Sequence, residues 1–346
     1  MQPQQASPQT VVPGASSAVR ACVAVLTDGH AGNRRQALAL AGALDAGTVL
    51  QTILQPRAPW RWASPRLLPG GAHGLGADFA ALLDRPPALA IGCGRQAALA
   101  TRLLRERGIQ TVQILDPRID PRHWDVVVAP EHDRLQGANV VGLVGSLHPV
   151  DARWLAQAQA RFPAFGALAR PRIALLVGGP SPHAQLDRAV LEECCDAIRT
   201  ACARDGGSVL ASTSRRSPVE WRQALRARLE GVPGSMWTGD AADSDNPYPG
   251  MLAWADRIVC TADSVNMLSE ACATQVPVYA AGVDALHGRP RAFVDALLRS
   301  GRIRMLDEGF ADFPVTPLRE TARVADQVRR RLGLPALADE RQSDVG

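Results

Sequence analysis

The sequence contains no lysine, because all 38 of its basic residues are arginine. This absence excludes the enzyme classes whose chemistry needs a lysine. No Schiff base can form with pyridoxal phosphate or with an aldolase substrate. A Walker-type phosphate loop and a protein-kinase ATP site each require a lysine as well. Aromatic residues are also scarce, at 4% of the chain, so aliphatic side chains and alanine must fill the cores.

Long apolar segments and paired cysteines are missing too. No run approaches the ~18 apolar residues that span a bilayer, and the start of the chain lacks the basic and apolar regions of a secretory signal. We expect residues 1–20 to form a disordered tail. The seven cysteines include no Cys-x-x-Cys pair and no zinc-binding spacing, which favours buried free thiols in a reducing cytoplasm. The net charge of +4 is mild and unclustered, so no nucleic-acid partner is expected.

Short apolar runs alternate with helical patterns in two successive sets. The first set begins near Ala21 with ACVAVLT, and the second begins with RIALLVGG after a break rich in proline, glycine and alanine. Alternating strands and helices predict mostly parallel sheets. We therefore expect an α/β protein with one unit over 21–165, a second over 171–313, and a closing helix with a loose tail over 314–346.

Ligands of parallel sheets bind at the carboxyl ends of the strands, so the turns after the strands are the candidate sites. The first turn, TDGHAGNRRQ, carries Gly29, Gly32 and Asn33 ahead of a helix start, where backbone amides attract phosphate. His30 is a candidate general base, because histidine ordinarily titrates near neutrality, and Asp28 is its candidate catalytic partner. A capped tight turn with a surface histidine is the alternative.

The turn IGCGRQAALA places Gly92, Gly94 and Ala97 in the pattern of a dinucleotide fingerprint, with Asp116 about 20 residues later. Such a fingerprint normally opens the first βαβ unit, whereas two strands precede this one. We therefore expect a glycine loop that contacts substrate or packs closely, with NAD binding as a distant alternative. The later pair His132-Asp133 fits either ligand binding or a surface turn.

Two turns of the second set suit a diphosphate. Gly178 and Gly179 end its first strand before a long helix, which repeats the layout of the first turn. The stretch ASTSRRSP follows another strand, and hydroxyl and arginine side chains at a helix start bind phosphate well. Its candidate ligands are Ser212, Arg215 and Arg216.

The helix within TADSVNMLSEA gives the most informative pattern. Asp263, Asn266 and Glu270 are three and four residues apart, so they share one helix face. Ser264 opens the helix, where free amides can bind a phosphate, and the carboxylate of Glu270 can accept both hydroxyls of a ribose. One helix would then hold a nucleotide, whereas a capped helix start with a solvated glutamate is the alternative. Asn246 of the preceding DNPY motif belongs to the same donor-binding set.

The segment RAPWRWASPRLLPGG places two tryptophans and two leucines among three arginines. This composition suits the interface of a bilayer with anionic lipid, and a loop folded over the first unit is the alternative. The apolar candidates are Trp60, Trp62, Leu67 and Leu68. Asp243-Ser244-Asp245 matches the Asp-x-Asp of metal-dependent sugar transferases, but a triplet in an acidic loop is too little to predict a metal.

Several phrases occur here in a familiar order: TDGHAGNRRQ, DPR with APEHD, LVGGPS, TSRRSP, DNPY and TADSVNMLSEA. Together they resemble the ELM mitochondrial-fission family of plants and bacteria, from about Val23 to Leu334. That family is similar to GT-B glycosyltransferases such as the lipid-linked N-acetylglucosaminyltransferase of peptidoglycan synthesis. The resemblance implies two Rossmann-like domains facing across a cleft, with the acceptor on the first, the nucleotide-sugar on the second, and a final helix over 318–332 that returns to the first.

The resemblance also implies roles for single residues. Ser264 would hold the diphosphate, Glu270 the ribose and the Gly178-Gly179 loop a phosphate, while His30 would lie near the reacting centre. The expected activity is metal-independent transfer of a sugar from a nucleotide-diphosphate donor to an envelope-related, lipid-linked acceptor, without a further cofactor. The protein would be cytoplasmic and peripheral on the inner face of the cytoplasmic membrane. A nucleotide-sugar epimerase and a non-catalytic, membrane-associated scaffold protein are the alternatives.

Overall fold

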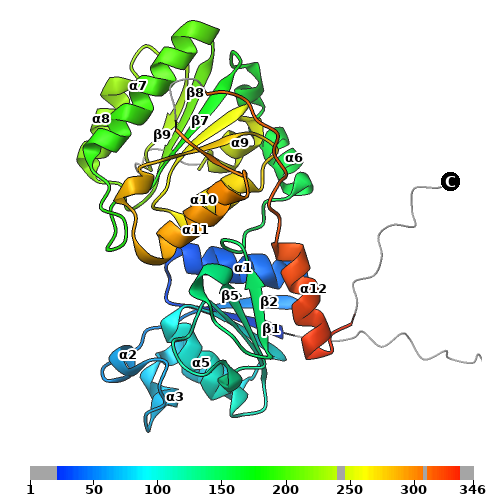
Figure 1. Ribbon diagram of the computed structural model, residues 1–346. Coiled ribbons are helices and arrows are strands. Elements are labelled where there is room, and N and C mark those ends of the chain that lie inside the picture. Colours follow the sequence, from blue (N-terminus) through cyan, green and yellow to red (C-terminus); the bar gives the residue numbers. More distant parts are fainter. Residues whose placement is uncertain (1–21, 240–245, 307–309, 336–346) are drawn as a thin grey trace, which may run out of the picture.

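The computed structural model describes residues 22–239, 246–306 and 310–335. The expected tail over 1–20, the Asp243-Ser244-Asp245 triplet and the chain beyond residue 335 lie outside these ranges. Two six-stranded sheets, parallel at every pairing, form two units that are stacked one above the other (Figure 1). The expected α/β architecture of GT-B type is confirmed.

Strands and helices alternate along each unit. The first unit contains β1 Cys22–Thr27, α1 Ala31–Leu44, β2 Thr48–Ile53, α2 Trp60–Ala63, α3 Gly71–Gly74, α4 Ala77–Asp84, β3 Leu89–Cys93, α5 Arg95–Arg105, β4 Gln110–Ile114, β5 Val126–Pro130 and β6 Val140–Leu143. The second contains α6 Ala152–Arg161, β7 Arg172–Val177, α7 Arg188–Asp205, β8 Ser208–Thr213, α8 Val219–Arg228, β9 Gly234–Trp237, α9 Tyr248–Trp254, β10 Arg257–Thr261, α10 Val265–Cys272, β11 Val278–Ala281, α11 Gly288–Arg299 and β12 Arg304–Met305. The last helix is α12 Thr321–Leu332.

The strand order of each sheet reverses at one point. The first sheet runs β2-β1-β3-β4-β5-β6 and reverses between β1 and β3, and the second runs β12-β11-β10-β7-β8-β9 and reverses between β7 and β10. In open parallel sheets, the crevice at such a reversal, beyond the carboxyl ends of the strands, is where ligands bind. The turns after β1, β3, β7 and β10 are therefore the positions to compare with the predicted site.

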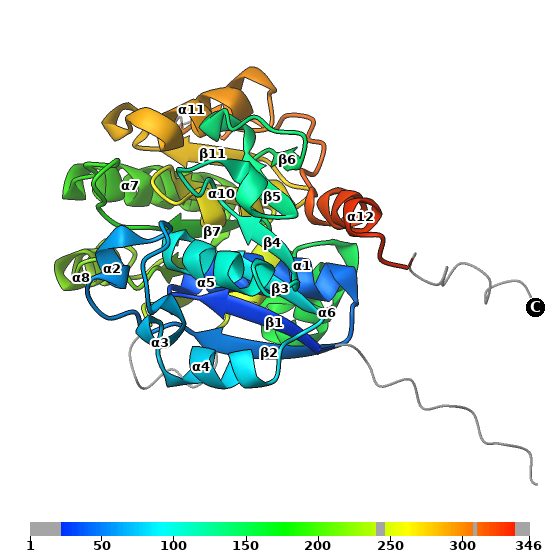
Figure 2. The same ribbon diagram turned by 90° about the horizontal axis from the view of Figure 1, so that it is seen from below.

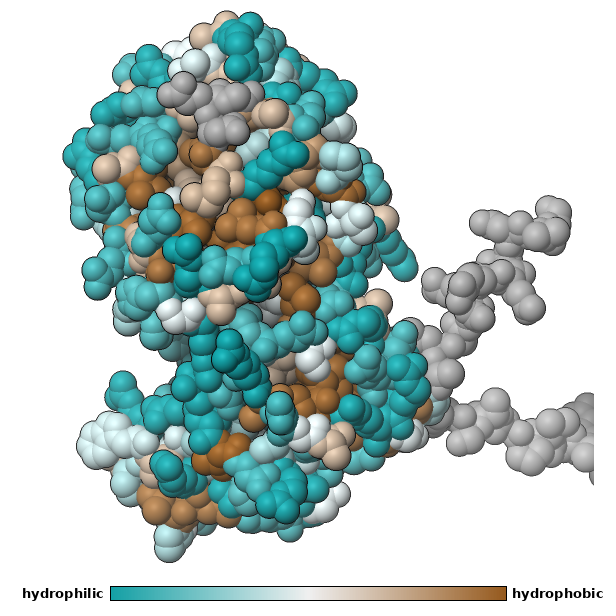
Figure 3. Space-filling model, viewed as in Figure 1, coloured by the Kyte–Doolittle hydropathy of each residue, from teal (hydrophilic) through white to brown (hydrophobic). Residues whose placement is uncertain are grey.

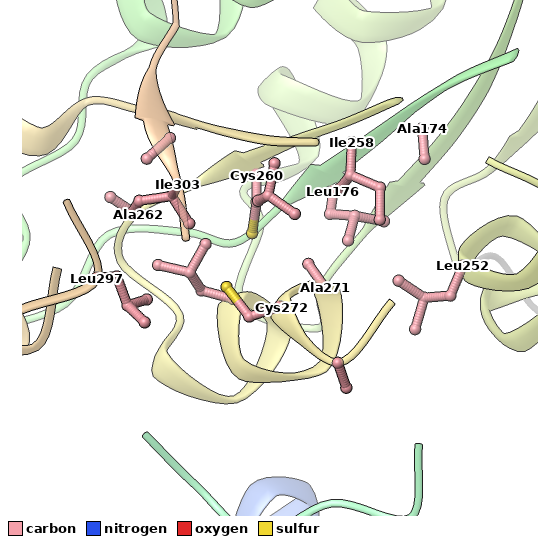
Figure 4. Packing of buried hydrophobic residues seen from close by; sticks show 14 of the residues in the cluster. Ala174, Leu176, Leu252, Ile258, Cys260, Ala262, Ala271, Cys272, Leu297 and Ile303 are labelled. Atoms are coloured by element: carbon pink, nitrogen blue, oxygen red, sulfur yellow. The ribbon is translucent and has the colours of Figure 1, made fainter. Parts of the chain in front are cut away.

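The central strands are almost entirely buried because helices cover both faces of each sheet. Every residue of β7 is buried, for example. Figure 4 shows the side chains of Leu176 on β7 and of Ile258 and Cys260 on β10, which lie above Ala271 and Cys272 of α10. The apolar face of α10 is thus fixed against the sheet, and its opposite face meets α1 of the first unit.

The helix α12 packs against α1 of the first unit, although it follows the whole second unit in the sequence (Figures 1 and 2). Its buried residues join the core of the first sheet, where they pack with Leu40 and Leu44. They are Val324, Ala325, Val328 and Leu332. The chain therefore crosses between the units twice, once after β6 and once before α12.

The tryptophan-rich segment folds back onto α5. Arg95 at the start of α5 donates to the carbonyl oxygens of Arg61, Trp62 and Ser64 at 3.1–3.3 Å. Trp60 packs so closely on Gly74 that no side chain fits there, whereas Trp62 is 71% exposed. Leu67 joins the same core, and Leu68 is half-buried. Trp60 and Leu67 thus pack in a loop folded over the first unit, which was the alternative expectation. Of the four apolar candidates, only Trp62 is largely exposed.

The surface seen in Figure 3 is mostly hydrophilic, with separate apolar patches on both units and a narrowing where the units meet. Along the edge strand β2, Val49, Leu50 and Ile53 are 37–50% exposed. Within the described ranges, no helix combines the length and the apolar character needed to cross a bilayer.

Candidate functional site

The turns at the reversal of the first sheet pack directly on each other. Gly94, which follows β3, has a φ of +91°, and a Cβ built there would lie 2.7 Å from the Nδ2 atom of Asn33. Asn33 in turn donates to both carboxylate oxygens of Asp28 at 3.0 and 3.1 Å. The predicted residues of the turns after β1 and β3 therefore form one continuous floor at this end of the sheet.

His30 stands on this floor with its ring held by Asp28. The Nδ1 atom of His30 lies 3.0 Å from Oδ1 of Asp28, and the same oxygen accepts the backbone N–H of His30 at 3.1 Å. The His30 side chain is 80% exposed, and its Nε2 atom has no hydrogen bond with any described residue. A carboxylate that orients one ring nitrogen leaves the other available to take a proton from a ligand.

Gly92 lies inside β3 and has a packing role. A Cβ there would lie 2.7 Å from Cγ2 of Thr101 on α5 and 2.9 Å from Oε1 of Gln113 on β4. Any side chain at this position would push the helix away from the sheet. The glycine pattern around Gly92 is thus explained by close packing of α5 on the sheet, which was one of the two expectations for this turn.

The reversal of the second sheet is organised by Asp263. Its buried carboxylate accepts from the backbone N–H of Gly179 at 2.9 Å and from the guanidinium of Arg216 at 2.7 Å. The same carboxylate accepts from Thr261, whose hydroxyl oxygen in turn accepts the N–H of Gly178. The amides of both loop glycines are therefore occupied. Asp263 holds the loop in place, whereas we expected its carboxylate to contact the donor directly.

The remaining predicted donor ligands fall into exposed and enclosed groups. Ser264 caps α10 by accepting from the N–H of Met267 at 3.4 Å, and it is partly exposed at the helix start. Arg215 is exposed and makes no ion pair with a described residue. Ser212 lies buried in β8 at 2% exposure, which removes it from the loop surface. Asn246 is exposed and accepts from the N–H of Tyr248 at 3.0 Å, so it orders the start of α9.

Glu270 is buried between the two units and is not a solvated surface residue. Its carboxylate accepts the hydroxyl of Tyr248 at 2.6 Å, and its Oε1 atom lies 3.0 Å from Nη1 of Arg35 on α1. Burial raises the pKa of Glu270, while Arg35 and the Tyr248 hydroxyl oppose this rise. The guanidinium of Arg35 also lies over the Tyr248 ring, 5.3 Å from its centroid.

The contact around Glu270 brings α1 and α10 together. Gln36 donates to Asn266 at 3.4 Å, and a Cβ at Gly32 would collide with the Asn266 amide. The predicted residues of the first turn and of the donor helix therefore meet across the boundary between the units. The two sheet reversals face each other, as a site shared by both units requires.

A second contact joins the units, and the sequence indicated the residues on only one side of it. Arg289 on α11 lies 2.8 Å from Asp116 after β4 and 3.0 Å from Asp133 after β5. The side chains of Asp133 and its neighbour His132 are only 6% and 11% exposed, so both point away from solvent, although Glu131 and Arg134 on either side are exposed. Burial raises the pKa of Asp133 and lowers that of His132. The two carboxylates were noted as candidates, but nothing in the sequence marked Arg289.

Comparison with known proteins identifies the family. A family profile described as "Mitochondrial fission ELM1" matches residues 31–332. The chain is 30% identical over 278 residues to the mitochondrial fission protein ELM1 of Arabidopsis thaliana, in a match that covers 71% of this chain and 64% of the plant protein. The chain thus spans less than two thirds of that relative. It is 21% identical over 347 residues to the RP120 protein of Rickettsia prowazekii, covering 88% of this chain and 97% of that protein.

The fold is similar to that of a solved enzyme. The UDP-GlcNAc 2-epimerase from Methanocaldococcus jannaschii superposes with a TM-score of 0.55 at 11% identity, over 89% of this chain and 99% of that chain. At this identity the similarity concerns the fold alone. The profile match, by contrast, extends from the start of α1 to the end of α12 and includes the turns after β3, β7 and β10. The chain belongs to the mitochondrial fission ELM1 family.

Proposed function

We propose that this protein is a glycosyltransferase that binds a nucleotide-diphosphate sugar between its two units and transfers the sugar without a metal ion. The observation that carries the proposal is the pairing of the two sheet reversals, with an oriented histidine on one side and cationic and helix-start groups on the other. An acid–base group opposite an anion site is the arrangement that such a transfer needs.

The diphosphate would lie at the start of α10, beside Arg215 and Arg216. The loop glycines cannot donate to it, since their amides already bind Thr261 and Asp263. The first amides of a helix have no partner within the helix, and they favour an anion. Arg216 is 44% exposed even while it binds Asp263, so part of its guanidinium faces outward. These groups would stabilise the departing diphosphate.

The ribose would bind Glu270 after the units separate. In the arrangement described here Arg35 and Tyr248 occupy this carboxylate, and its exposure is 1%. Hinge movements that open and close two domains around a ligand are common in two-domain enzymes. The nucleotide would then replace Arg35 as the partner of Glu270, and His30, oriented by Asp28, would take the proton of the acceptor hydroxyl.

The proposal is tested by a thermal-shift screen against UDP, GDP, CMP, TDP and their common sugar conjugates. A ligand at ~100 times its Kd adds about 2.7 kcal/mol of stability. Arg215→Met should weaken the best nucleotide roughly tenfold, about 1.4 kcal/mol, whereas the exposed control Arg299→Met on α11 should not. His30→Gln should retain nucleotide binding and lose turnover. Absence of a shift with any nucleotide would favour the scaffold alternative.

A nucleotide-sugar epimerase is a second candidate, and the Asp116–Arg289–Asp133 contact favours it. Epimerisation removes and returns a proton on the sugar, and Asp133 carries a pKa raised by burial, as a proton-transferring carboxylate requires. Such an enzyme would change the donor with no acceptor present. Incubation of the bound nucleotide-sugar alone, followed by NMR of the anomeric protons, distinguishes the two activities.

The acceptor would be lipid-linked, and the protein would associate with the inner face of the cytoplasmic membrane through the first unit. The exposed ring of Trp62 and the neighbouring Arg57, Arg61 and Arg66 support this part of the proposal. Arginine beside an exposed tryptophan suits an anionic bilayer surface. Trp60 and Leu67 contribute to packing instead, and Leu68 is half-buried.

A further inference from the structure

A crevice of about 310 Å³ lies between α1, the connection that follows β6, and the start of α12. It is separate from the nucleotide site proposed above, and none of its lining residues belongs to that site. Its walls combine apolar groups with a few polar ones. The lining residues that matter here are Leu38, Gly42, His148, Val150, Arg319 and Thr321.

Two of the polar groups at the crevice lack partners. His148 is 4% exposed, and its Nδ1 atom has no hydrogen-bond partner among the described residues. The Nη2 atom of Arg319 is likewise buried without a described partner, while its Nε donates to the carbonyl of Ala273 at 3.0 Å. A buried donor without an acceptor costs about 1–3 kcal/mol. A ligand that enters the crevice can supply the acceptors that these two groups lack.

The start of α12 adds a third set of donors. Thr321 and Ala322 are its first two residues and both line the crevice. No side chain caps this helix, because Glu320 at its cap position binds Arg323 and the N–H of Val144. The first amides of a helix remain free and carry partial positive charge. The three sets of donors therefore favour an anion.

One carboxylate also lines the crevice. Asp151 is exposed, and its carboxylate accepts the N–H of Trp154 at 2.7 Å as the cap of α6. Leu38, Pro149 and Val150 supply the apolar part of the wall. The volume corresponds to about ten water molecules at ~30 Å³ each. A ligand with one anionic end and a short apolar body fits both the charge and the size.

We propose that this crevice binds a small organic phosphate with an apolar body, whose phosphate accepts from His148, Arg319 and the start of α12. The site would lie where the chain crosses between the units, against both crossings. Through Arg319 it also contacts the end of α10. A ligand there would connect α1, α12 and α10. It would so favour the arrangement of the units described here, in which Arg35 binds Glu270.

Gly42 provides a variant that blocks the crevice without harming the fold. A Cβ at Gly42 meets no atom within 4 Å, and the residue lies inside α1. Replacing a helical glycine generally stabilises a helix, by up to about 1 kcal/mol. The Gly42→Met side chain would extend into the crevice. The matched control is Ala203→Met, at an exposed position of the helix α7.

The test is calorimetric titration of the full chain with n-butyl phosphate, inorganic phosphate and n-butylammonium. We expect butyl phosphate to bind wild type and Ala203→Met equally, at least tenfold more weakly to Gly42→Met, and more tightly than inorganic phosphate. His148→Phe should weaken binding while keeping the fold. Absence of binding, equal binding by Gly42→Met, or equal binding of butylammonium would overturn the proposal. Nucleotide affinity, measured in parallel, should be unchanged in Gly42→Met. The proposal for the crevice and the proposed nucleotide site are therefore tested independently.

Discussion

Arg35 on α1 and Glu270 on α10 form an ion pair that joins the two units, with Nη1 and Oε1 3.0 Å apart. The pair is asymmetric, because the side chain of Arg35 is 38% exposed and that of Glu270 only 1%. The cation can leave into water at little cost, whereas the carboxylate cannot be left buried and unpaired. A ligand that takes the place of Arg35 beside Glu270 and again excludes water must therefore supply new donors, and the hydroxyls of a ribose meet that need.

Replacement of Arg35 tests two consequences of this ion pair, its effect on stability and its effect on nucleotide binding. Arg35→Met should lower the free energy of unfolding by about 2 kcal/mol, less than for a fully buried pair because Arg35 is partly exposed. Under the proposed function the same variant should bind the nucleotide several-fold more tightly, since no cation competes for Glu270. Urea unfolding and calorimetry measure the two quantities.

The control for this experiment is Arg34→Met. Arg34 is the exposed neighbour of Arg35 and binds Gln51 at the edge strand. It should change neither quantity. Weaker nucleotide binding in Arg35→Met would instead place Arg35 among the donor ligands and would contradict the exchange of partners at Glu270.

The lowered pKa of His148 predicts that the folded protein loses stability in mild acid. Burial, aided by Arg35 and Arg319, lowers the pKa of His148 from 6.5 to about 4. Between these values the unfolded chain binds a proton that the folded chain does not, so lowering the pH favours unfolding. At about 1.4 kcal/mol per pKa unit, this residue should remove about 3 kcal/mol between pH 6.5 and pH 4.

The variant His148→Gln should lack this part of the pH dependence. Denaturant unfolding at several pH values measures it as the difference between the two proteins, which cancels the contributions of other groups. Parallel curves for wild type and His148→Gln across this range would show that the folded protein accepts the proton without cost.

Arg302 binds the C-terminal end of α10, and we expect its replacement to destabilise the fold. It is 6% exposed, and its guanidinium donates to the carbonyl oxygens of Ala271, Cys272 and Thr274 at 2.9–3.3 Å. A cation at a helix C-terminus is favoured by the helix dipole, and its removal leaves buried carbonyls without donors. Arg302→Met should lower the free energy of unfolding by about 2–3 kcal/mol. The exposed Arg299→Met, measured in the same urea titration, should stay within about 0.5 kcal/mol of wild type.

Trp62 gives the sharpest test of membrane association. Because Trp60 and Leu67 pack within the unit, only Trp62 can be changed without disturbing the core. Trp62→Ser should weaken sedimentation with vesicles that contain anionic lipid, and added salt should weaken it further. The exposed Val219→Ser on the second unit is the control. Equal sedimentation of wild type and Trp62→Ser would remove the membrane surface from the proposed function.

The positions of the strands and helices were predictable because their signals are local. Continuous apolar runs mark the buried strands, and the four-residue spacing of Asn266 and Glu270 placed both on the face of α10 that meets α1. Asp263, which was expected on the same face, precedes the helix and binds the glycine loop. The rule that ligands bind beyond the carboxyl ends of strands then selected the turns that the fold brings to the two sheet reversals. Each of these steps depends on residues within one turn or one helix.

The surroundings of single side chains were not predictable in this way. Glu270 was expected to be accessible, but its partner Arg35 is 235 positions away in the sequence and belongs to the other unit. Asp263 was expected to meet the ligand, yet it is enclosed by Arg216 and the loop amides. No spacing rule reports contacts between units, since they depend on how the two sheets are stacked. Arg289, Arg319 and His148 were missed for the same reason.

The return of α12 to the first unit also sets the order in which the protein can mature. A ribosome adds residues from the N-terminus, and early domains commonly fold while later ones are still being made. Here the core around Leu40 and Leu44 lacks Val324 and Val328 until the last helix has been translated. The unit that is synthesised first is therefore completed last, and a nascent chain that stalls before α12 carries an open apolar face on α1 for chaperones to cover.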